Sequence, residues 1–232
     1  MIEKTFAFVV YPGFTVLDLV GPLQVLNHHA ATDPSVRVVV VGETREVLGT
    51  DTPLRVAPSH TFAEVPDPDW VLVPGGAAPT LRALSDTTLI GYLRRAAAGA
   101  ALMTSVCTGS LLLGEAGLLE GRKATTHWLF RDLLRAFGAE PVAQRWVEDG
   151  PVITAAGVSA GIDLALHLVE RIAGPAAARS VQFAIEYDPQ PPHGPLDWAE
   201  APHEGLRSRR EAVLRDGLAD APQLRDKLLA QG

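Results

Sequence analysis

The strongest constraint on the fold is a series of short apolar runs in which apolar and polar residues do not alternate. These runs lie at residues 5–11, 36–41, 70–73 and 101–106. Strands without alternation are typical of a sheet that is covered on both faces. Stretches with helical spacing of apolar residues lie between or after the runs, at 17–29, 80–98 and 109–119. The pattern predicts an α/β fold in which a mostly parallel sheet is sandwiched by helices.

The second half of the chain continues the pattern and ends in a charged tail. We expect helices at 128–137, 159–173 and from Pro175 toward Tyr187, strands at 142–147 and 152–155, and a break of the 80–98 helix near Ser85-Asp86. Residues 188–195 are rich in proline and predict a surface arm. Residues 204–230 mix acidic, basic and leucine residues, which favours an amphipathic helix with a solvated face over a DNA-reading helix.

Composition restricts the classes of partner. The formal net charge of -7 argues against nucleic acid as the main partner, because phosphate binding requires a basic surface. A single cysteine cannot form a disulfide within the chain and fits a reducing compartment. The N-terminus lacks a signal pattern, and no apolar stretch has the length of a membrane span. We expect a cytoplasmic protein that acts on a small molecule.

The only cysteine, Cys107, lies where the apolar run at 101–106 should turn into a helix. This arrangement is typical of a nucleophile elbow, in which the residue at the bend stands at the carboxyl edge of the sheet. Amides at the start of the next helix favour an anion at the bend, so we expect a thiol that ionises more easily than a free one. The alternative is a buried structural cysteine, the commoner fate of an isolated Cys.

Glycine-containing turns follow three of the strands, at 11–13, 74–76 and 107–109. In a parallel sheet these turns meet at the carboxyl edge, where glycine lets the backbone approach a ligand. We expect the amides of Gly76 and Thr108 to stabilise negative charge, with Gly75 beside them and the Thr108 hydroxyl able to hold a water. For any one of these turns by itself an ordinary tight βα turn is the favoured explanation, whereas three of them beside the only cysteine favour a site.

Asp18 and His127 are the two candidate proton carriers. Asp18 is flanked by apolar residues near a helix start. This predicts either a helix-terminus charge or a partly buried acid with a raised pKa that shares a proton with a substrate or with Cys107. His127 fits a Cys–His pair and a helix cap about equally. No cluster of His, Cys, Asp and Glu has metal-ligand spacing, and Gly75-Gly76 lacks the rest of a dinucleotide fingerprint.

Together these stretches resemble the ThiJ/PfpI superfamily, which has a flavodoxin-like, class I glutamine amidotransferase-like fold. The resemblance covers about the first four fifths of the chain and rests on residues 10–14, 17–22, 73–76, 105–110, 117–119, 124–128 and 159–163. It implies a ThiJ/PfpI-like catalytic domain over 1–192, with the arm and helical tail of 193–232 packed on the same domain. It also implies a homodimer.

Within the superfamily the resemblance is to the branch of isonitrile (isocyanide) hydratases. It implies that Cys107 is the nucleophile, that Asp18 is the acid facing it, and that His127 is not essential. The implied reaction turns an isocyanide into an N-substituted formamide through a covalent thioimidate, without metal or organic cofactor. The alternatives are another cysteine enzyme of this fold (a glyoxalase, deglycase or amidase) or a non-enzymatic ligand- or oxidant-sensing domain related to AraC-type regulators. Such regulators continue into a helix-turn-helix pair, for which this chain stops too soon.

Overall fold

The computed structural model describes residues 4–230 and contains one main sheet among them. Its strands run in the order β10-β11-β7-β6-β1-β2-β5. Their bounds are β1 (Lys4–Val9), β2 (Val36–Gly42), β5 (His60–Thr61), β6 (Trp70–Val73), β7 (Leu102–Ser105), β10 (Trp146–Asp149) and β11 (Val152–Ala155). All neighbouring pairs are parallel except β10 with β11, which form an antiparallel hairpin. The expected α/β architecture with a mostly parallel sheet is confirmed.

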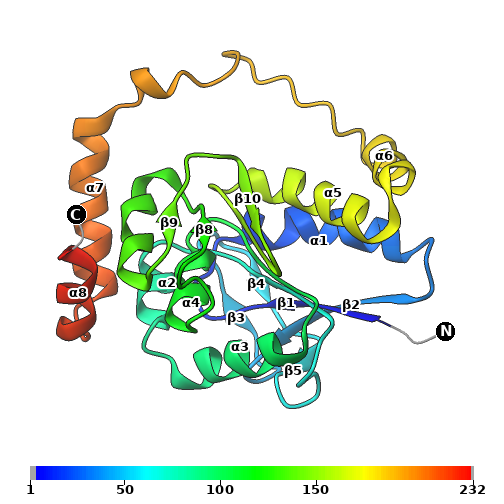
Figure 1. Cartoon of the computed structure of the whole chain (residues 1–232), viewed down its shortest axis with the longest axis horizontal. Helices are drawn as coiled ribbons and strands as arrows, with labels where there is room; N and C mark the ends of the chain where they lie inside the picture. The colour runs from blue at the N-terminus through cyan, green and yellow to red at the C-terminus, as the bar shows by residue number, and fades with distance from the viewer. Residues whose placement is uncertain (1–3, 231–232) are drawn as a thin grey trace.

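Helices cover both faces of this sheet (Figure 1). One layer holds α1 (Val16–Ala30), α5 (Ala160–Ala173) and α6 (Pro175–Ala184), which pack on one another. The other holds α2 (Ala78–Ala83), α3 (Thr87–Gly99), α4 (Gly109–Glu115) and the 3₁₀ segment η1 (Trp128–Phe137). Because both faces are covered, the central strands are buried along their whole length: every residue of β6 and β7 is buried. This is the physical reason that these strands lack alternation.

The helix expected at 80–98 is broken where the sequence indicated. Asp86 begins α3 as its N-cap, and its Oδ1 accepts hydrogen bonds from the amides of Thr88 and Leu89, both at 3.0 Å. A side-chain cap satisfies amides that have no partner within the helix. The break separates a short α2, which lies beside the turn after β6, from a longer α3.

The strand expected at 142–147 is wrong. Residues 140–141 form the short strand β9 (Glu140–Pro141), which pairs with β8 (Lys123–Ala124), and β10 begins only at Trp146. The Val142 amide still bonds to the Ala124 carbonyl at 2.8 Å. The chain therefore leaves one small sheet and joins the edge of the main sheet within these residues. A further two-stranded hairpin, β3 (Leu48–Gly49) with β4 (Arg55–Val56), was also not foreseen.

The tail forms two helices rather than the single one expected at 204–230. These are α7 (His203–Gly217) and α8 (Pro222–Leu229), after a short 3₁₀ turn η2 (Trp198–Glu200). The helix cannot continue through Pro222, which lacks an amide hydrogen and occupies the first turn of α8. The arm before η2 arches from α6 across to α7 (Figure 1).

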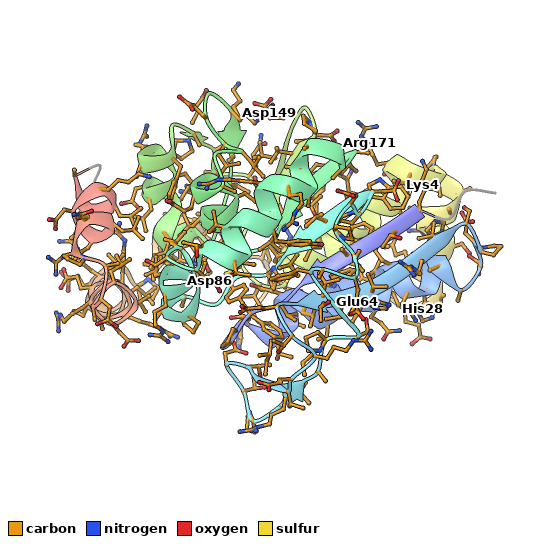
Figure 2. The ribbon with its side chains drawn as sticks, turned by 90° about the horizontal axis from the view of Figure 1, so that it is seen from below. Lys4, His28, Glu64, Asp86, Asp149 and Arg171 are labelled. Atoms are coloured by element: carbon orange, nitrogen blue, oxygen red, sulfur yellow. The ribbon has the colours of Figure 1, made fainter. Side chains whose placement is uncertain are left out.

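The described part of the tail lies against the main body. α7 packs on α2, where Arg82 forms an ion pair of 2.9 Å with Asp216, and on η1, where Arg210 pairs with Asp132. Leu218 at its end is fully buried. Figure 2 shows charged side chains spread over the outside of the molecule. No helix within residues 4–230 is long and apolar enough to span a bilayer.

The packing of the tail predicts a position-dependent cost of truncating its leucines. Leu218 is fully buried, whereas Leu229 is 47% exposed. We expect Leu218→Ala to lower the free energy of unfolding by about 2–4 kcal/mol and Leu229→Ala by less than about 1 kcal/mol, because only the first opens a cavity. Chemical denaturation of both variants measures the difference. Equal effects would contradict the docking of α7.

Candidate active site

Cys107 occupies a strained bend between β7 and α4. Its backbone has φ +57°, in the left-handed region that non-glycine residues rarely adopt. Its amide donates to the carbonyls of Ala155 (3.2 Å) and Ala156 (3.0 Å). Its carbonyl accepts a hydrogen bond from the hydroxyl of Thr126 at 2.7 Å. These contacts hold the bend from both sides, so the geometry of a nucleophile elbow persists in spite of a strain on the order of 1–3 kcal/mol.

The bend and the turn after β6 touch so closely that neither can carry a side chain at the contact. A Cβ on Gly75 would lie 2.5 Å from the Thr108 amide nitrogen and 2.9 Å from the Cys107 Cβ. A Cβ on Gly109 would lie 2.2 Å from the Val73 carbonyl oxygen. Glycine at both positions therefore lets the Pro74–Gly76 turn lie directly on the cysteine.

Asp18 lies inside the molecule at the same edge of the sheet. Its side chain is fully buried, and its Oδ2 accepts a hydrogen bond from the Gly75 amide at 2.9 Å. Its other oxygen, Oδ1, is buried without a hydrogen-bond partner. Burial raises the pKa of this carboxyl to about 7, although the Gly75 amide and the nearby Cys107 thiol work against the increase. At neutral pH Asp18 is therefore able both to give and to take a proton.

The alternative role of Asp18 as a helix-terminus charge is filled by another residue. The N-cap of α1, Thr15, makes no side-chain cap bond. Instead Asp51, from the β3–β4 hairpin, accepts a hydrogen bond from the Val16 amide at 2.9 Å. The Asp18 carboxyl points to Gly75 and not to the first amides of its own helix.

The expectation of an easily ionised thiol is not met. Burial, followed by the negative charge of Asp18, raises the pKa of Cys107 well above its usual range, and the backbone amides of Thr108 and Val158 only partly oppose this. The sequence indicates the amides at the start of α4, which lower the pKa of the thiol. It does not reveal the burial or the nearby carboxylate, which raise it. Asp18 and Cys107 thus form a buried pair that keeps at least one proton well above neutral pH, and the acid is the first of the two to ionise.

Gly76 and Thr108 differ from the expectation in what they bind. The Gly76 amide donates to the Thr108 hydroxyl at 3.0 Å, so it does not face an open position where charge develops. The same hydroxyl accepts from the Ala77 amide at 3.3 Å and contacts the Thr80 hydroxyl at 2.9 Å, which leaves it no need of a water. The Gly75 and Gly76 amides therefore hold the site together, and the Thr108 amide faces the sulfur.

Sequence reasoning missed Val158, whose amide also faces the sulfur of Cys107. Val158 lies in the turn between β11 and α5 and has φ +23°, another strained bend. The turn follows a strand and contains Gly157, so it is a fourth turn of the kind that marked the site in the sequence. Only its tertiary position shows that its amide points inward.

His127 serves as a helix cap. Its Nδ1 accepts a hydrogen bond from the Leu129 amide at 3.3 Å at the start of η1. Burial, with a smaller effect of Arg209 from α7, lowers its pKa. A Cβ on Gly157 would lie 2.6 Å from the His127 Cδ2, so the ring packs against the turn that carries Val158. The contacts of His127 thus favour the capping alternative over a Cys–His pair.

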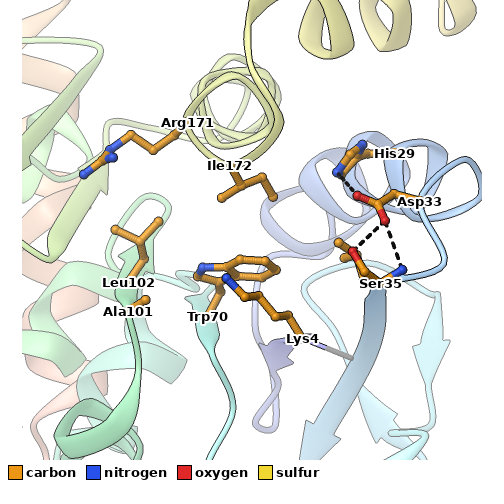
Figure 3. A pocket seen from close by; sticks show the side chains of 10 residues that line it. Lys4, His29, Asp33, Ser35, Trp70, Ala101, Leu102, Arg171 and Ile172 are labelled. Carbon is orange, nitrogen blue, oxygen red and sulfur yellow. Dashed lines mark hydrogen bonds and ion pairs between the residues drawn. The ribbon is translucent and has the colours of Figure 1, made fainter. Parts of the chain in front are cut away.

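Other features of the described residues lie away from this site. No group of three or more His, Cys, Asp or Glu side chains within residues 4–230 is arranged to hold a metal ion. A cavity of about 350 Å³ opens at the amino ends of the strands, the opposite edge from Cys107. Figure 3 shows Trp70 and Lys4 on one side of it, Ile172 across from them, and the cluster of His29, Asp33 and Ser35 at one end.

The buried Asp18 predicts a pH-dependent change in stability. Its pKa in the folded chain, about 7, exceeds the ordinary value of 3.8, so the folded chain keeps a proton that the unfolded chain releases. The resulting stability is complete below about pH 4 and is lost as the pH rises through about 7, up to about 4 kcal/mol. Asp18→Asn does not titrate, so it should unfold at higher denaturant than the parent at pH 8 and equally at pH 4.

Denaturant midpoints across this range measure the effect, and Asp188→Asn, at an exposed position, is the matched control that should follow the parent at every pH. An Asp18→Asn variant that loses stability equally at pH 4 and pH 8 would contradict the buried, proton-sharing acid.

The chain is similar to known proteins over most of its length. The model of the DJ-1/PfpI family matches residues 4–171. The chain is 43% identical to an isonitrile hydratase of Pseudomonas putida, over 80% of this chain and 79% of that protein. It is 34% identical to the HTH-type transcriptional regulator CdhR of Pseudomonas aeruginosa, over 79% of this chain and 55% of the regulator.

A solved structure gives the same result for the fold. A THiJ/PfpI family protein from Pseudomonas syringae superposes with a TM-score of 0.84 at 36% identity, covering 98% of this chain and 91% of that one. The match of the family model to most of the chain, the mostly parallel sheet and the cysteine elbow together show that this chain belongs to the DJ-1/PfpI family.

Proposed function

We propose that this chain hydrates isonitriles to N-substituted formamides, with Cys107 as the nucleophile and Asp18 as the group that moves the proton. The observation that carries the proposal is the buried pair itself: a fully buried carboxyl with a raised pKa, held by the Gly75 amide, beside the only thiol of the chain. The 43% identity to an isonitrile hydratase, over four fifths of this chain, supports the choice of substrate.

The first half of the reaction uses the proton that the pair holds. The Asp18 carboxylate takes the thiol proton as the sulfur bonds to the terminal carbon of R–N≡C. The same proton then passes from Asp18 to that carbon. One S–H bond breaks and one C–S and one C–H bond form, which gives the thioimidate R–N=CH–S–Cys107. The amides of Thr108 and Val158 stabilise negative charge on the sulfur during the attack.

The second half returns the thiol. Water adds to the imidate carbon while Asp18 takes one of its protons and delivers it to the nitrogen. The C–S bond then breaks, and the remaining hydroxyl proton returns through Asp18 to the sulfur. The products are R–NH–CHO and the free thiol, so all atoms of the isonitrile and the water are accounted for. Burial keeps bulk water from competing with the thiol in the first half.

We further propose that the chain acts as a cytoplasmic homodimer on small molecules and not on nucleic acid. The net charge of -7 and the single cysteine support the partner class and the compartment. Leu17 and Val20 on α1 are 41% and 37% exposed and lie one and two residues from Asp18 in sequence, and an exposed apolar pair there suits an interface. Residues 1–192 form the catalytic domain, and the tail of 193–232 belongs to the same domain, as the docking of α7 on α2 supports.

Formamide production from an alkyl isonitrile tests the proposed reaction. We expect turnover by the parent, none by Cys107→Ala, and a loss of about 10²- to 10⁴-fold with Asp18→Asn, because the amide keeps the size of the acid but cannot carry the proton. Methylglyoxal and simple amides serve as alternative substrates. Turnover of these without formamide formation, or activity that survives Cys107→Ala, would refute the proposal.

The pH dependence of kcat/KM is a second expected outcome. The reactive form is the pair with a single proton, so kcat/KM should rise as the pH increases through about 7, where Asp18 ionises, and then level off. A rate that falls across this range would mean that the doubly protonated pair reacts, against the scheme above.

Analytical ultracentrifugation tests the homodimer. The parent should sediment as a dimer at micromolar concentration, and Val20→Lys should shift it toward monomer by placing a charge in the interface. Leu229→Lys, at a position 47% exposed on the tail, is the control and should leave the dimer intact. A monomeric parent would overturn this part of the proposal.

A further inference from the structure

Three buried hydroxyls form a chain beneath the site. The three are Tyr11 from the turn after β1, Thr80 from α2 and Thr108 from the cysteine elbow, and all are at most 3% exposed. The Tyr11 hydroxyl lies 2.8 Å from that of Thr80, which lies 2.9 Å from that of Thr108. Tyr11 also donates to the Pro74 carbonyl at 2.9 Å. The mechanism above makes no use of Tyr11 or Thr80.

The two ends of this row of hydroxyls, Thr108 and Tyr11, determine the direction of every hydrogen bond in the row. The Thr108 oxygen already accepts from the amides of Gly76 and Ala77, so its own proton goes to Thr80. At the other end the Pro74 carbonyl can only accept, so Tyr11 donates to it. Thr80 therefore receives from Thr108 and donates to Tyr11. Every hydroxyl in this arrangement is both donor and acceptor, and a hydrogen-bonded chain of this kind reinforces itself.

The row of three hydroxyls fixes the turn after β6 on both sides of the Gly75 amide, which binds Asp18. The Pro74 carbonyl is held by Tyr11, and the amides of Gly76 and Ala77 are held by Thr108. Between them the Gly75 amide points to the Asp18 Oδ2. Ala77 has φ +48°, a strained conformation for alanine. We therefore expect the turn to relax to a less strained conformation when its hydrogen bonds to the hydroxyls are removed.

We propose that Thr80 and Tyr11 are positioning residues, which hold the Gly75 amide on Asp18 and thereby decide how Asp18 and Cys107 share their proton. Neither residue touches the reacting atoms. The proposal deepens the proposed function and rests on it, since it assigns the control of the same acid. The titratable groups that influence Asp18 are Cys107 and Asp51, and those that influence Tyr11 are Asp18 and Cys107.

The test follows the alkylation of the only cysteine by iodoacetamide from pH 5 to pH 10. In the parent the rate should show a step near pH 7, where Asp18 ionises and a fraction of its pair exists as thiolate. Thr80→Val keeps the shape of the side chain but removes the hydroxyl. A looser Gly75 amide stabilises the carboxylate less, so the step should move upward by about one pH unit, the size expected for a charge-assisted hydrogen bond. Tyr11→Phe should move it in the same direction.

Two controls separate positioning from stability. Thr80→Ser restores the hydroxyl and should return the step to its parental position. Thr104→Val removes another fully buried threonine hydroxyl, bonded to the Val71 carbonyl at 2.7 Å in the sheet. It should lower the melting temperature without moving the step. Superimposable pH profiles for the parent, Thr80→Val and Tyr11→Phe would overturn the proposal, and if Thr80→Val does not fold, Tyr11→Phe decides alone.

The readout also separates this proposal from the proposed function, because alkylation needs no isonitrile. If Thr80→Val shifts the pH step in alkylation but the parent makes no formamide, the positioning role stands and the proposed isonitrile hydration is refuted. Formamide production with unshifted steps would do the opposite.

Discussion

The site depends on one close contact, the packing of Gly75 against Cys107 and Thr108. The contact leaves no room for a Cβ, and it brings the turn after β6 onto the elbow after β7. From that position the Gly75 amide reaches the Asp18 carboxyl on α1, so a single residue connects three elements of the fold. The distance between acid and thiol is therefore set by backbone packing, which is much stiffer than two side chains on a surface.

Burying this acid beside the thiol destabilises the charged forms of both groups. Burial raises both pKa values. The negative charge of Asp18 further opposes ionisation of Cys107, whereas the thiol favours ionisation of Asp18. The fold tolerates this cost at its carboxyl edge, where the hydroxyls of Tyr11, Thr80 and Thr108 are all hydrogen-bonded. A buried carboxyl with a raised pKa beside a buried thiol is typical of a functional site.

Residues far apart in the sequence make this arrangement possible. Asp51, from the β3–β4 hairpin that follows β2, accepts the hydrogen bond of the first amide of α1. The Asp18 carboxyl is therefore free to accept from the Gly75 amide inside the molecule. Val158, from the turn before α5, contributes an amide to the sulfur. His127 caps η1 and packs on the turn that holds Val158. The docked α7 extends the same layer beyond the 4–171 region that the family model matches.

The sequence alone determined the layered sheet, the strand that carries Cys107 and the break at Asp86. Such features follow from local patterns: apolar runs, helical spacing, capping residues and a glycine turn after each strand. Proline likewise marks the boundary of α8, although the expected tail helix ran through it.

Only the tertiary structure decided what each amide and hydroxyl binds. The Gly76 amide meets the Thr108 hydroxyl, the Val158 amide meets the sulfur, and Asp51 takes over the start of α1. Burial likewise reversed the expected direction of the Cys107 pKa, because the desolvation of the thiol and the charge of Asp18 outweigh two backbone amides. Hydrogen-bond partners and dielectric surroundings come from residues distant in the chain, and a local pattern contains no information about them.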